Sequence, residues 1–227
     1  MKKIRESDSV LFWLSKSKDE VCNLMGAEVA EMVAYNQCNP HHCYDLFAHT
    51  VKNAQKRLSS LSINEPLLLV AAFFHDIGKV QTAKFKENRL VFYGHAQKSS
   101  EIARIVLNQM GYEKDEIEHI CFYISHHNDF ISYVLSDEDY NPNNPYLTEI
   151  TANNVKEHKM QVESMYSLGC TWNWKKVWFN LIILCYADAE AQSSKVYSGN
   201  TVIDSMQHKK NKVAAIESVF VSIYKQI

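Results

Sequence analysis

The sequence contains few of the residues that interrupt regular structure, with six glycines and four prolines among 227 residues. Glycine and proline are the strongest local breakers of helices and strands, and apolar residues recur along most of this chain at helical spacing. Neither a run of strand-like alternation nor an internal repeat or low-complexity tract is evident. We therefore predict an all-α fold, a compact multi-helix bundle.

The chain also lacks an excess of positive charge, since 24 Lys and Arg residues face 26 Asp and Glu residues. Broad electrostatic binding of duplex nucleic acid requires a clustered basic surface, so we expect no duplex nucleic-acid partner. None of the six cysteines forms a Cys-x-x-Cys pair, which favours reduced thiols in a cytosolic protein.

Long apolar segments are absent as well. The longest apolar stretch, around Trp178–Ala187, is too short and too interrupted to cross a bilayer. Charged residues such as Arg5, Glu6 and Asp8 break the N-terminal region, which therefore has no signal-peptide apolar core. We expect a cytoplasmic protein without a membrane partner.

Apolar periodicity and capping residues place the expected helices. Pro66 fits the first position of one helix, which stops near Gly78, and Gly111 fits the end of the helix that begins near His95. Residues 86–92 are expected to be a polar connection and 137–145 an irregular polar loop. The predicted helices cover residues 10–14, 19–35, 44–61, 67–76, 95–110, 114–126, 154–168, 174–194 and 205–224.

The dipeptide His75-Asp76 is the most informative motif, because it ends an apolar helical run and is followed by Ile77-Gly78-Lys79. An apolar segment seldom buries an aspartate unless a positive charge compensates it. A divalent metal ion is a natural compensator. The partial negative charge at the end of this helix also favours a cation nearby.

Further imidazoles and one carboxylate could complete the coordination of such an ion. They lie on other predicted helices, and a helical bundle can direct them at one interior point. Imidazole and carboxylate ligands together suit Fe, Mn, Zn, Co or Ni. The residues in question are His49, His95, His126, His127 and Asp188.

Each residue taken alone also has an ordinary explanation. A single mid-helix histidine such as His49, or a helix-opening one such as His95, is more often a partly buried residue without a ligand. Asp188 in a very apolar helix is harder to dismiss, because an unpartnered buried carboxylate is costly. Taken together, the set indicates a site. His41, His42, His119, His158 and His208 lie in polar or loop contexts and receive no role.

The ordered set resembles the HD superfamily of metal-dependent phosphohydrolases. The resembling region covers roughly Tyr35 to Ser194 and is similar to the HD domain of bacterial tRNA nucleotidyltransferases. It is carried by Asn39-Pro40-His41-His42, Asp45-Leu46-Phe47-Ala48-His49-Thr50, Phe74-His75-Asp76-Ile77-Gly78-Lys79, Phe92-Tyr93-Gly94-His95 and Asp188.

The resemblance implies a role for each matching residue. His49, His75, Asp76 and Asp188 would bind a first divalent ion, which the family allows to be Fe, Mn, Ni, Co, Mg or Zn. Asp76 would bridge to a second ion held by His95 and by one of His126 and His127, with His127 the better match. Successive helical positions diverge by about 100°, so these two histidines should do different jobs unless the helix has already ended.

The implied activity is hydrolysis of a phosphomonoester or phosphodiester, most naturally a nucleotide. A metal-activated hydroxide would attack phosphorus, with Asp76 as a central catalytic residue. Lys79 would offset phosphoryl charge, although a solvated helix-terminal lysine is the alternative. An imidazole such as His126 would protonate the leaving oxygen, although His126 could instead support a metal ligand or face the phosphate. The loop at 128–150 is either a pocket wall or, more simply, a surface loop.

Some family features are missing. Ala96 replaces a glutamate that often follows the glycine-histidine pair, which weakens the case for a second ion. Neither the Gly-Tyr-Pro of cyclic-di-GMP phosphodiesterases, nor the paired acids of ppGpp hydrolases, nor a nucleotidyltransferase signature occurs. We expect an HD domain over 35–195, with an N-terminal helical extension (1–34) and a C-terminal helix (196–227) that packs on it.

Two other classes of function stay open. One is a catalytically silent HD module that binds a nucleotide or RNA for regulation. The other is a structural interaction domain that uses exposed aromatic residues such as Trp172 and Trp174. The oligomeric state also stays open, a homodimer included.

Overall fold

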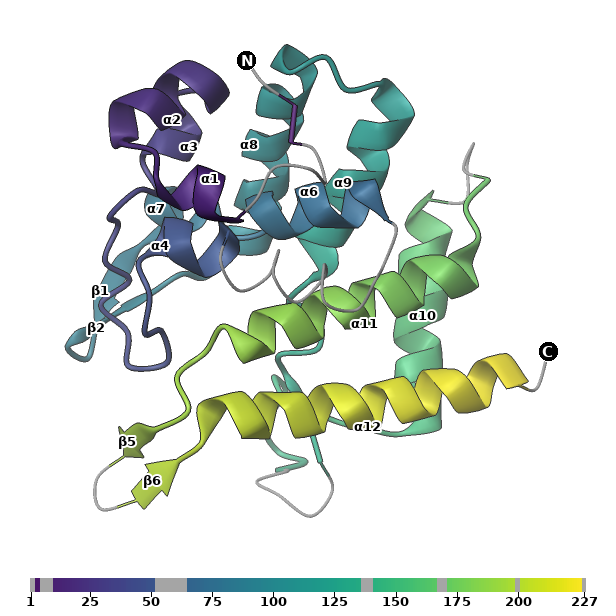
Figure 1. Cartoon of the computed structure of the whole chain (residues 1–227). Coiled ribbons are helices and arrows are strands. Elements are labelled where there is room, and N and C mark those ends of the chain that lie inside the picture. The colour runs from purple at the N-terminus through teal and green to yellow at the C-terminus, as the bar shows by residue number, and fades with distance from the viewer. Residues whose placement is uncertain are drawn as a thin grey trace.

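The computed structural model describes residues 3–4, 10–51, 65–135, 141–166, 171–198 and 201–225. Within these ranges the chain is helical, as predicted, with small two-stranded ladders at the edges of the bundle. Figure 1 shows one group of helices above a long antiparallel pair formed by α11 and α12.

The N-terminal part forms short helices rather than the single helix predicted over 19–35. They are α1 (Val10–Leu14), α2 (Lys18–Met25) and α3 (Ala27–Ala30). The break falls at Gly26, whose φ of 99° is outside the helical region. The N-cap of α2 is Ser17, not Asp19, and its hydroxyl and the Glu20 carboxylate form a reciprocal capping box.

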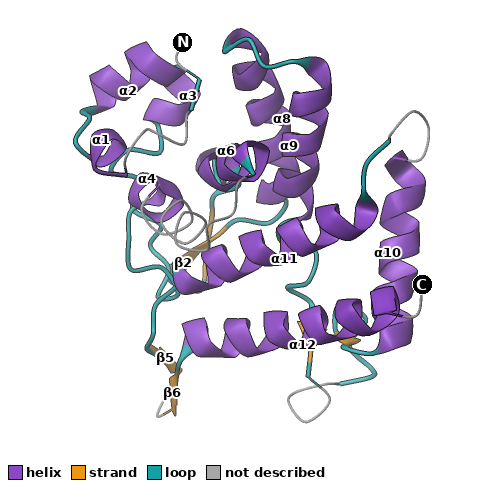
Figure 2. Cartoon of the chain, turned by 45° about the vertical axis from the view of Figure 1, so that its right-hand side comes forward, coloured by secondary structure: helices purple, strands orange, loops and turns teal. Residues whose placement is uncertain are grey.

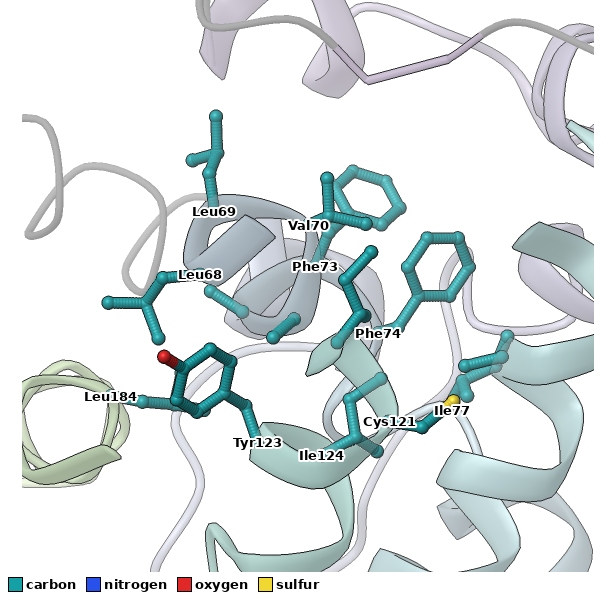
Figure 3. Close-up of a cluster of buried hydrophobic side chains, with 14 of the residues drawn as sticks. Leu68, Leu69, Val70, Phe73, Phe74, Ile77, Cys121, Tyr123, Ile124 and Leu184 are labelled. Carbon is teal, nitrogen blue, oxygen red and sulfur yellow. The ribbon is translucent and has the colours of Figure 1, made fainter. Parts of the chain in front are cut away.

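The centre of the upper group is α6 (Pro66–Phe74), which packs against α8 (His95–Gln109) and α9 (Lys114–His126). Pro66 occupies the first turn of α6, as predicted. Figure 3 shows Leu68 of α6 beside Tyr123 of α9 and Leu184 of α11. α6 is apolar on nearly all sides because other elements surround it.

The lower part consists of α10 (Ala152–Tyr166), α11 (Trp174–Glu190) and α12 (Ser205–Lys225). Figures 1 and 2 show α11 and α12 side by side, with α10 near the C-terminal end of α12. Trp178 of α11 stacks on Phe220 of α12 with ring centroids 5.2 Å apart. Because α12 packs on α11 in the opposite direction, the N-terminal part of α12 lies beside the C-terminal part of α11.

Three two-stranded ladders depart from the expectation that the chain forms no strands. Residues 86–92 are not a simple polar connection, because they belong to a hairpin whose turn residues Glu87 and Asn88 have φ values of 50° and 62°. Each strand is too short to show an alternating pattern in the sequence. The ladders are β1 (Lys84–Lys86) with β2 (Arg89–Val91), β3 (Tyr133–Val134) with β4 (Thr148–Glu149), and β5 (Val196–Ser198) with β6 (Thr201–Ile203).

The remaining short helices are α4 (Leu46–Ala48) and α7 (Lys79–Thr82). Asp45 caps α4, its Oδ1 accepting a hydrogen bond from the Ala48 amide at 3.0 Å. The predicted helix over 44–61 begins here, while its part over 52–61 lies outside the described residues, as does 137–140 of the predicted polar loop. In the regions that the structure describes, no helix is both long and apolar enough to cross a membrane.

Candidate metal centre

Four of the predicted ligands meet at one buried point. His49 follows α4, His75 and Asp76 follow α6, and Asp188 lies on α11. His49 Nε2 lies 3.2 Å from Asp76 Oδ2 and 3.2 Å from Asp188 Oδ1. His75 Nε2 lies 3.3 Å and 3.6 Å from the same two oxygens. One potential ligand atom from each residue falls within 4.8 Å of all the others.

A second group shares Asp76 with the first. The other carboxylate oxygen, Asp76 Oδ1, lies 3.2 Å from His95 Nε2 and 3.6 Å from His127 Nε2. Asp76 therefore presents one oxygen to each group, which is the geometry expected of a bridging carboxylate. The structure brings together all six residues for which ligand roles were predicted.

Backbone carbonyls orient three of the imidazoles. The Nδ1 atoms of His75, His95 and His127 donate to the carbonyls of Ala72, Phe92 and Ile124 at 2.8, 2.8 and 2.6 Å. Because a carbonyl only accepts, the proton lies on Nδ1, and the Nε2 lone pair of a neutral ring faces the centre. Such contacts fix the tautomer of histidines that bind metals.

The facing nitrogen atoms create a need for positive charge. His95 Nε2 lies 3.3 Å from His127 Nε2, and two lone pairs at this separation repel each other unless a cation lies between them. Both ring nitrogens of His49 and the Nε2 of His75 are buried without a hydrogen-bond partner among the described residues. Buried polar atoms are rarely left unsatisfied, so this donor set fits a divalent ion.

The two carboxylates are ionised in spite of their burial. Burial alone would raise the pKa of Asp76, but Lys79 and His75 outweigh it and hold that pKa well below its usual range. Burial opposes ionisation of Asp188 in the same way, and Lys209 lowers its pKa. Burial would lower the pKa of His75, yet without a cation between them the neighbouring carboxylates raise it to about 10, so that a proton on Nε2 then takes the place of an ion. The pair of aspartates thus demands several positive charges.

Gly78 allows the two groups to approach each other. Its φ of −71° shows that it is not the left-handed helix terminator expected from the sequence. A Cβ at this position would lie 2.5 Å from the Ser99 amide nitrogen and 2.7 Å from the His95 carbonyl oxygen. The Gly78 amide donates to Ser99 Oγ at 2.9 Å. Close contact with the first turn of α8 therefore brings His95 to Asp76.

Lys79 is not the solvated lysine that the sequence left open. Its side chain is buried, at 4% exposure, and its Nζ lies 2.7 Å from Asp76 Oδ2. Nζ also donates to Gln37 Oε1 at 3.1 Å and lies 3.5 Å from His42 Nε2. The ammonium group is consequently fixed beside the bridging carboxylate.

His126 makes its contacts in a cluster next to the two groups. Its Nδ1 is hydrogen-bonded to Asp129 Oδ2 at 2.6 Å, and its Nε2 to the Tyr166 hydroxyl at 3.1 Å. Its ring packs against Phe122, with centroids 4.7 Å apart. Both nitrogens are thus engaged in a neighbouring cluster, and His126 is not among the residues that line the cavity, so its role as a proton donor to a leaving group stays a prediction.

The two groups form the floor of a cavity of about 580 Å³. The members of the two groups that line this cavity are Asp76, His95, His127 and Asp188, all of them buried. Asn128, Phe130 and Ile131, from the start of the predicted 128–150 loop, form part of one wall. The remaining lining residues are mainly basic or aromatic and include Lys79, Arg89, Phe92, Tyr93, Lys209 and Lys212.

Sequence reasoning missed several residues of this cavity. His42 received no role, yet it lines the cavity beside Lys79. Burial and the nearby Lys79 charge lower the pKa of His42 to about 2, so its ring is neutral. The flanking segment Asn39-Pro40-His41-His42 was the available signal. Lys209 forms an ion pair with Asp188, but it resembled any helical surface lysine in the sequence.

Comparison with known proteins agrees with this geometry. The HD domain family matches residues 41–158, about half of the chain. The chain belongs to the HD domain family, whose members are generally metal-dependent hydrolases. The match ends at residue 158, so the predicted ligand Asp188 lies outside the matched region.

A curated relative extends the comparison. The CC-adding tRNA nucleotidyltransferase of Thermus thermophilus is 34% identical over 105 residues. The match covers 45% of this chain and 24% of the relative. This chain therefore corresponds to about a quarter of that protein.

Proposed function

We propose that this protein is a metal-dependent phosphohydrolase that cleaves a phosphomonoester or phosphodiester, with a nucleotide as substrate. The observation that carries the proposal is the convergence of two histidine–aspartate groups on the shared carboxylate of Asp76 at the floor of a basic cavity. Membership in the HD domain family supports the same reaction class.

His49, His75, Asp76 and Asp188 would hold one divalent ion, and Asp76, His95 and His127 a second. When bound, such ions act as Lewis acids on phosphoryl oxygens and make coordinated water a nucleophile near neutral pH. The backbone carbonyls that hold His75, His95 and His127 keep their Nε2 atoms directed at this point.

Lys79 and His42 are the residues that would receive the phosphoryl group. Lys79 Nζ donates toward His42 Nε2, which leaves the proton of this neutral ring on Nδ1. His42 Nδ1 is a buried donor without a partner in the described part of the chain. The Lys79 ammonium group in the cavity lining, beside the neutral ring of His42, favours a bound oxyanion.

Hydrolysis of p-nitrophenyl phosphate and bis(p-nitrophenyl) phosphate with Mn²⁺, Ni²⁺, Co²⁺ or Mg²⁺ tests the proposal. We expect turnover of at least one ester with at least one ion. Asp76→Ala should reduce it by at least about 10³-fold, since this change removes both sites of Lewis-acid stabilisation. Bound metal without turnover of these esters or of a nucleotide panel would instead identify a silent binding module.

A further inference from the structure

One wall of the cavity carries a second concentration of positive charge, which begins at Lys209 beside Asp188 and includes Arg89. Arg89 comes from β2, His41 from the segment before α4, and Lys209 from α12. We call these three residues the outer wall. Arg89 and Lys209 both lie near His41. Burial is the main cause that lowers the pKa of His41, and the charges of Arg89 and Lys209 lower it further.

Hydrogen bonds tie the elements of the outer wall together. The Leu90 amide donates to the Cys38 carbonyl at 3.0 Å, and the Ser193 amide donates to the His41 carbonyl at 2.9 Å. His41 Nδ1 lies 2.9 Å from Ser205 Oγ at the start of α12. The outer wall is therefore a fixed part of the structure.

Positive charge exceeds negative charge around the cavity. Asp76 and Asp188 are the carboxylates among its lining residues, and Lys79 and Lys209 already face them. Arg89 lines the cavity and forms no salt bridge within the ranges that the structure describes. Gathering like charges is unfavourable, so this arrangement favours an anion beyond the phosphoryl group held at the floor.

The size of the cavity allows such a ligand. About 580 Å³ lies within the range of roughly 300–1,000 Å³ typical of sites that hold a whole small molecule. Phe92 and Tyr93 line the same side as Arg89, and Tyr93 is 72% exposed at this position. The cavity thus offers both an aromatic surface and two separate cationic regions.

We infer that Arg89 and Lys209 form a second phosphate subsite, so that the favoured substrate is a nucleotide with two phosphate groups. The inference rests on the proposed function and specifies its substrate class. The reacting phosphate would lie at the floor near Lys79. The guanidinium of Arg89 would hold the other phosphate through paired N–H donors, a geometry that a lysine cannot reproduce.

Calorimetric titration of the full Mn²⁺-loaded protein with AMP, ADP and adenosine 3′,5′-bisphosphate tests the subsite. We expect ADP or the bisphosphate to bind at least about tenfold more tightly than AMP. Arg89→Ala should remove most of this advantage and leave AMP affinity within about twofold, while Arg89→Lys should retain part of it.

Lys84→Ala is the matched control, because Lys84 lies on the same hairpin, is exposed, and is absent from the cavity lining. Equal affinities for the three nucleotides, or equal losses in Lys84→Ala and Arg89→Ala, would overturn the subsite. Hydrolysis of p-nitrophenyl phosphate in the same preparations separates the two proposals. Turnover without discrimination among the nucleotides defeats the subsite alone, whereas discrimination without turnover of any substrate defeats the hydrolase.

Discussion

The adjacent histidines His126 and His127 enter two buried clusters that look alike in composition and differ in chemistry. His127 joins the candidate metal centre, where its Nε2 faces Asp76 and His95. His126 joins a hydrogen-bonded cluster in which Asp129 Oδ2 lies 2.6 Å from His126 Nδ1 and 2.9 Å from His158 Nε2.

The difference lies in what balances the carboxylate. In the cluster around Asp129, burial raises its pKa, but the two imidazoles outweigh this effect and lower it. Both nitrogens of His126 have partners there. In the metal centre, by contrast, imidazole lone pairs converge without hydrogen-bond donors between them. Composition alone therefore does not distinguish a structural cluster from an ion site, whereas the direction of the imidazole protons does.

Separate substitution of the two neighbouring histidines tests the comparison most severely. His127→Ala removes an Nε2 atom from the group that shares Asp76, and we expect at least about a 100-fold loss of turnover. His126→Phe keeps the ring packing against Phe122 and should stay within about tenfold of wild type. Steady-state kinetics with saturating Mn²⁺ measures both. Equal losses in the two variants would mean that the clusters are not functionally distinct.

Removal of metal should lower the stability of the protein through the candidate metal centre and not through the cluster around Asp129. A ligand that binds only the folded state at 100 times its Kd stabilises that state by about 2.7 kcal/mol. For a chain of this size, chelation should therefore lower Tm by about 5–10 °C. Differential scanning calorimetry with and without EDTA provides the measurement. Asp76→Ala serves as the control and should show no shift; a similar shift in that variant would place the stabilising ion elsewhere.

Gly78→Ala tests how the metal centre is assembled. The added Cβ would meet the backbone of Ser99 and His95, so we expect a destabilisation of about 1–3 kcal/mol and weaker metal binding. Gly111→Ala is the matched control, because Gly111 has a φ of 78° and open space where a Cβ would lie. That variant should lose stability by about 1–2 kcal/mol and keep its metal. Chemical denaturation and metal titration distinguish the two; unchanged metal affinity in Gly78→Ala would contradict the packing role.

Disruption of the hydrogen-bonded cluster should have the smallest effect. Asp129→Asn replaces a carboxylate that contacts two imidazoles, and we expect a loss of about 1–3 kcal/mol in the free energy of unfolding. Metal content should not change. Urea denaturation and elemental analysis check the two halves of this prediction. Loss of metal at unchanged stability would assign Asp129 to the metal centre instead.

Helix periodicity predicted much of the fold because most helices bury a regular apolar face. The bounds of α9 agree with the prediction, and Gly111 has the predicted positive φ. Local backbone events were not predictable in the same way: Gly26 splits the N-terminal helix, and the strands of the ladders span only two or three residues.

Site residues that belong to an ordered sequence motif were predictable. Site residues that only tertiary packing brings to the cavity were not. The six predicted ligands converge, and His126 and His127 diverge as the rotation per helical residue suggested. Lys209 and Arg89 have no distinguishing sequence context, and only the packing of α12 and β2 brings them to the cavity. The engagement of His126 by Tyr166 depends on contact between α9 and α10, which spacing along the chain does not encode.

Metal stoichiometry by elemental analysis of the protein loaded with Mn²⁺ and then freed of excess ion is the most direct test. The paired groups around Asp76 predict one to two ions per chain in the wild type and in Asp129→Asn, and fewer than about 0.2 in Asp76→Ala, because loss of the shared carboxylate weakens both groups. A wild-type protein that retains no ion under these conditions would contradict the assignment of the converging histidines and aspartates as a metal centre.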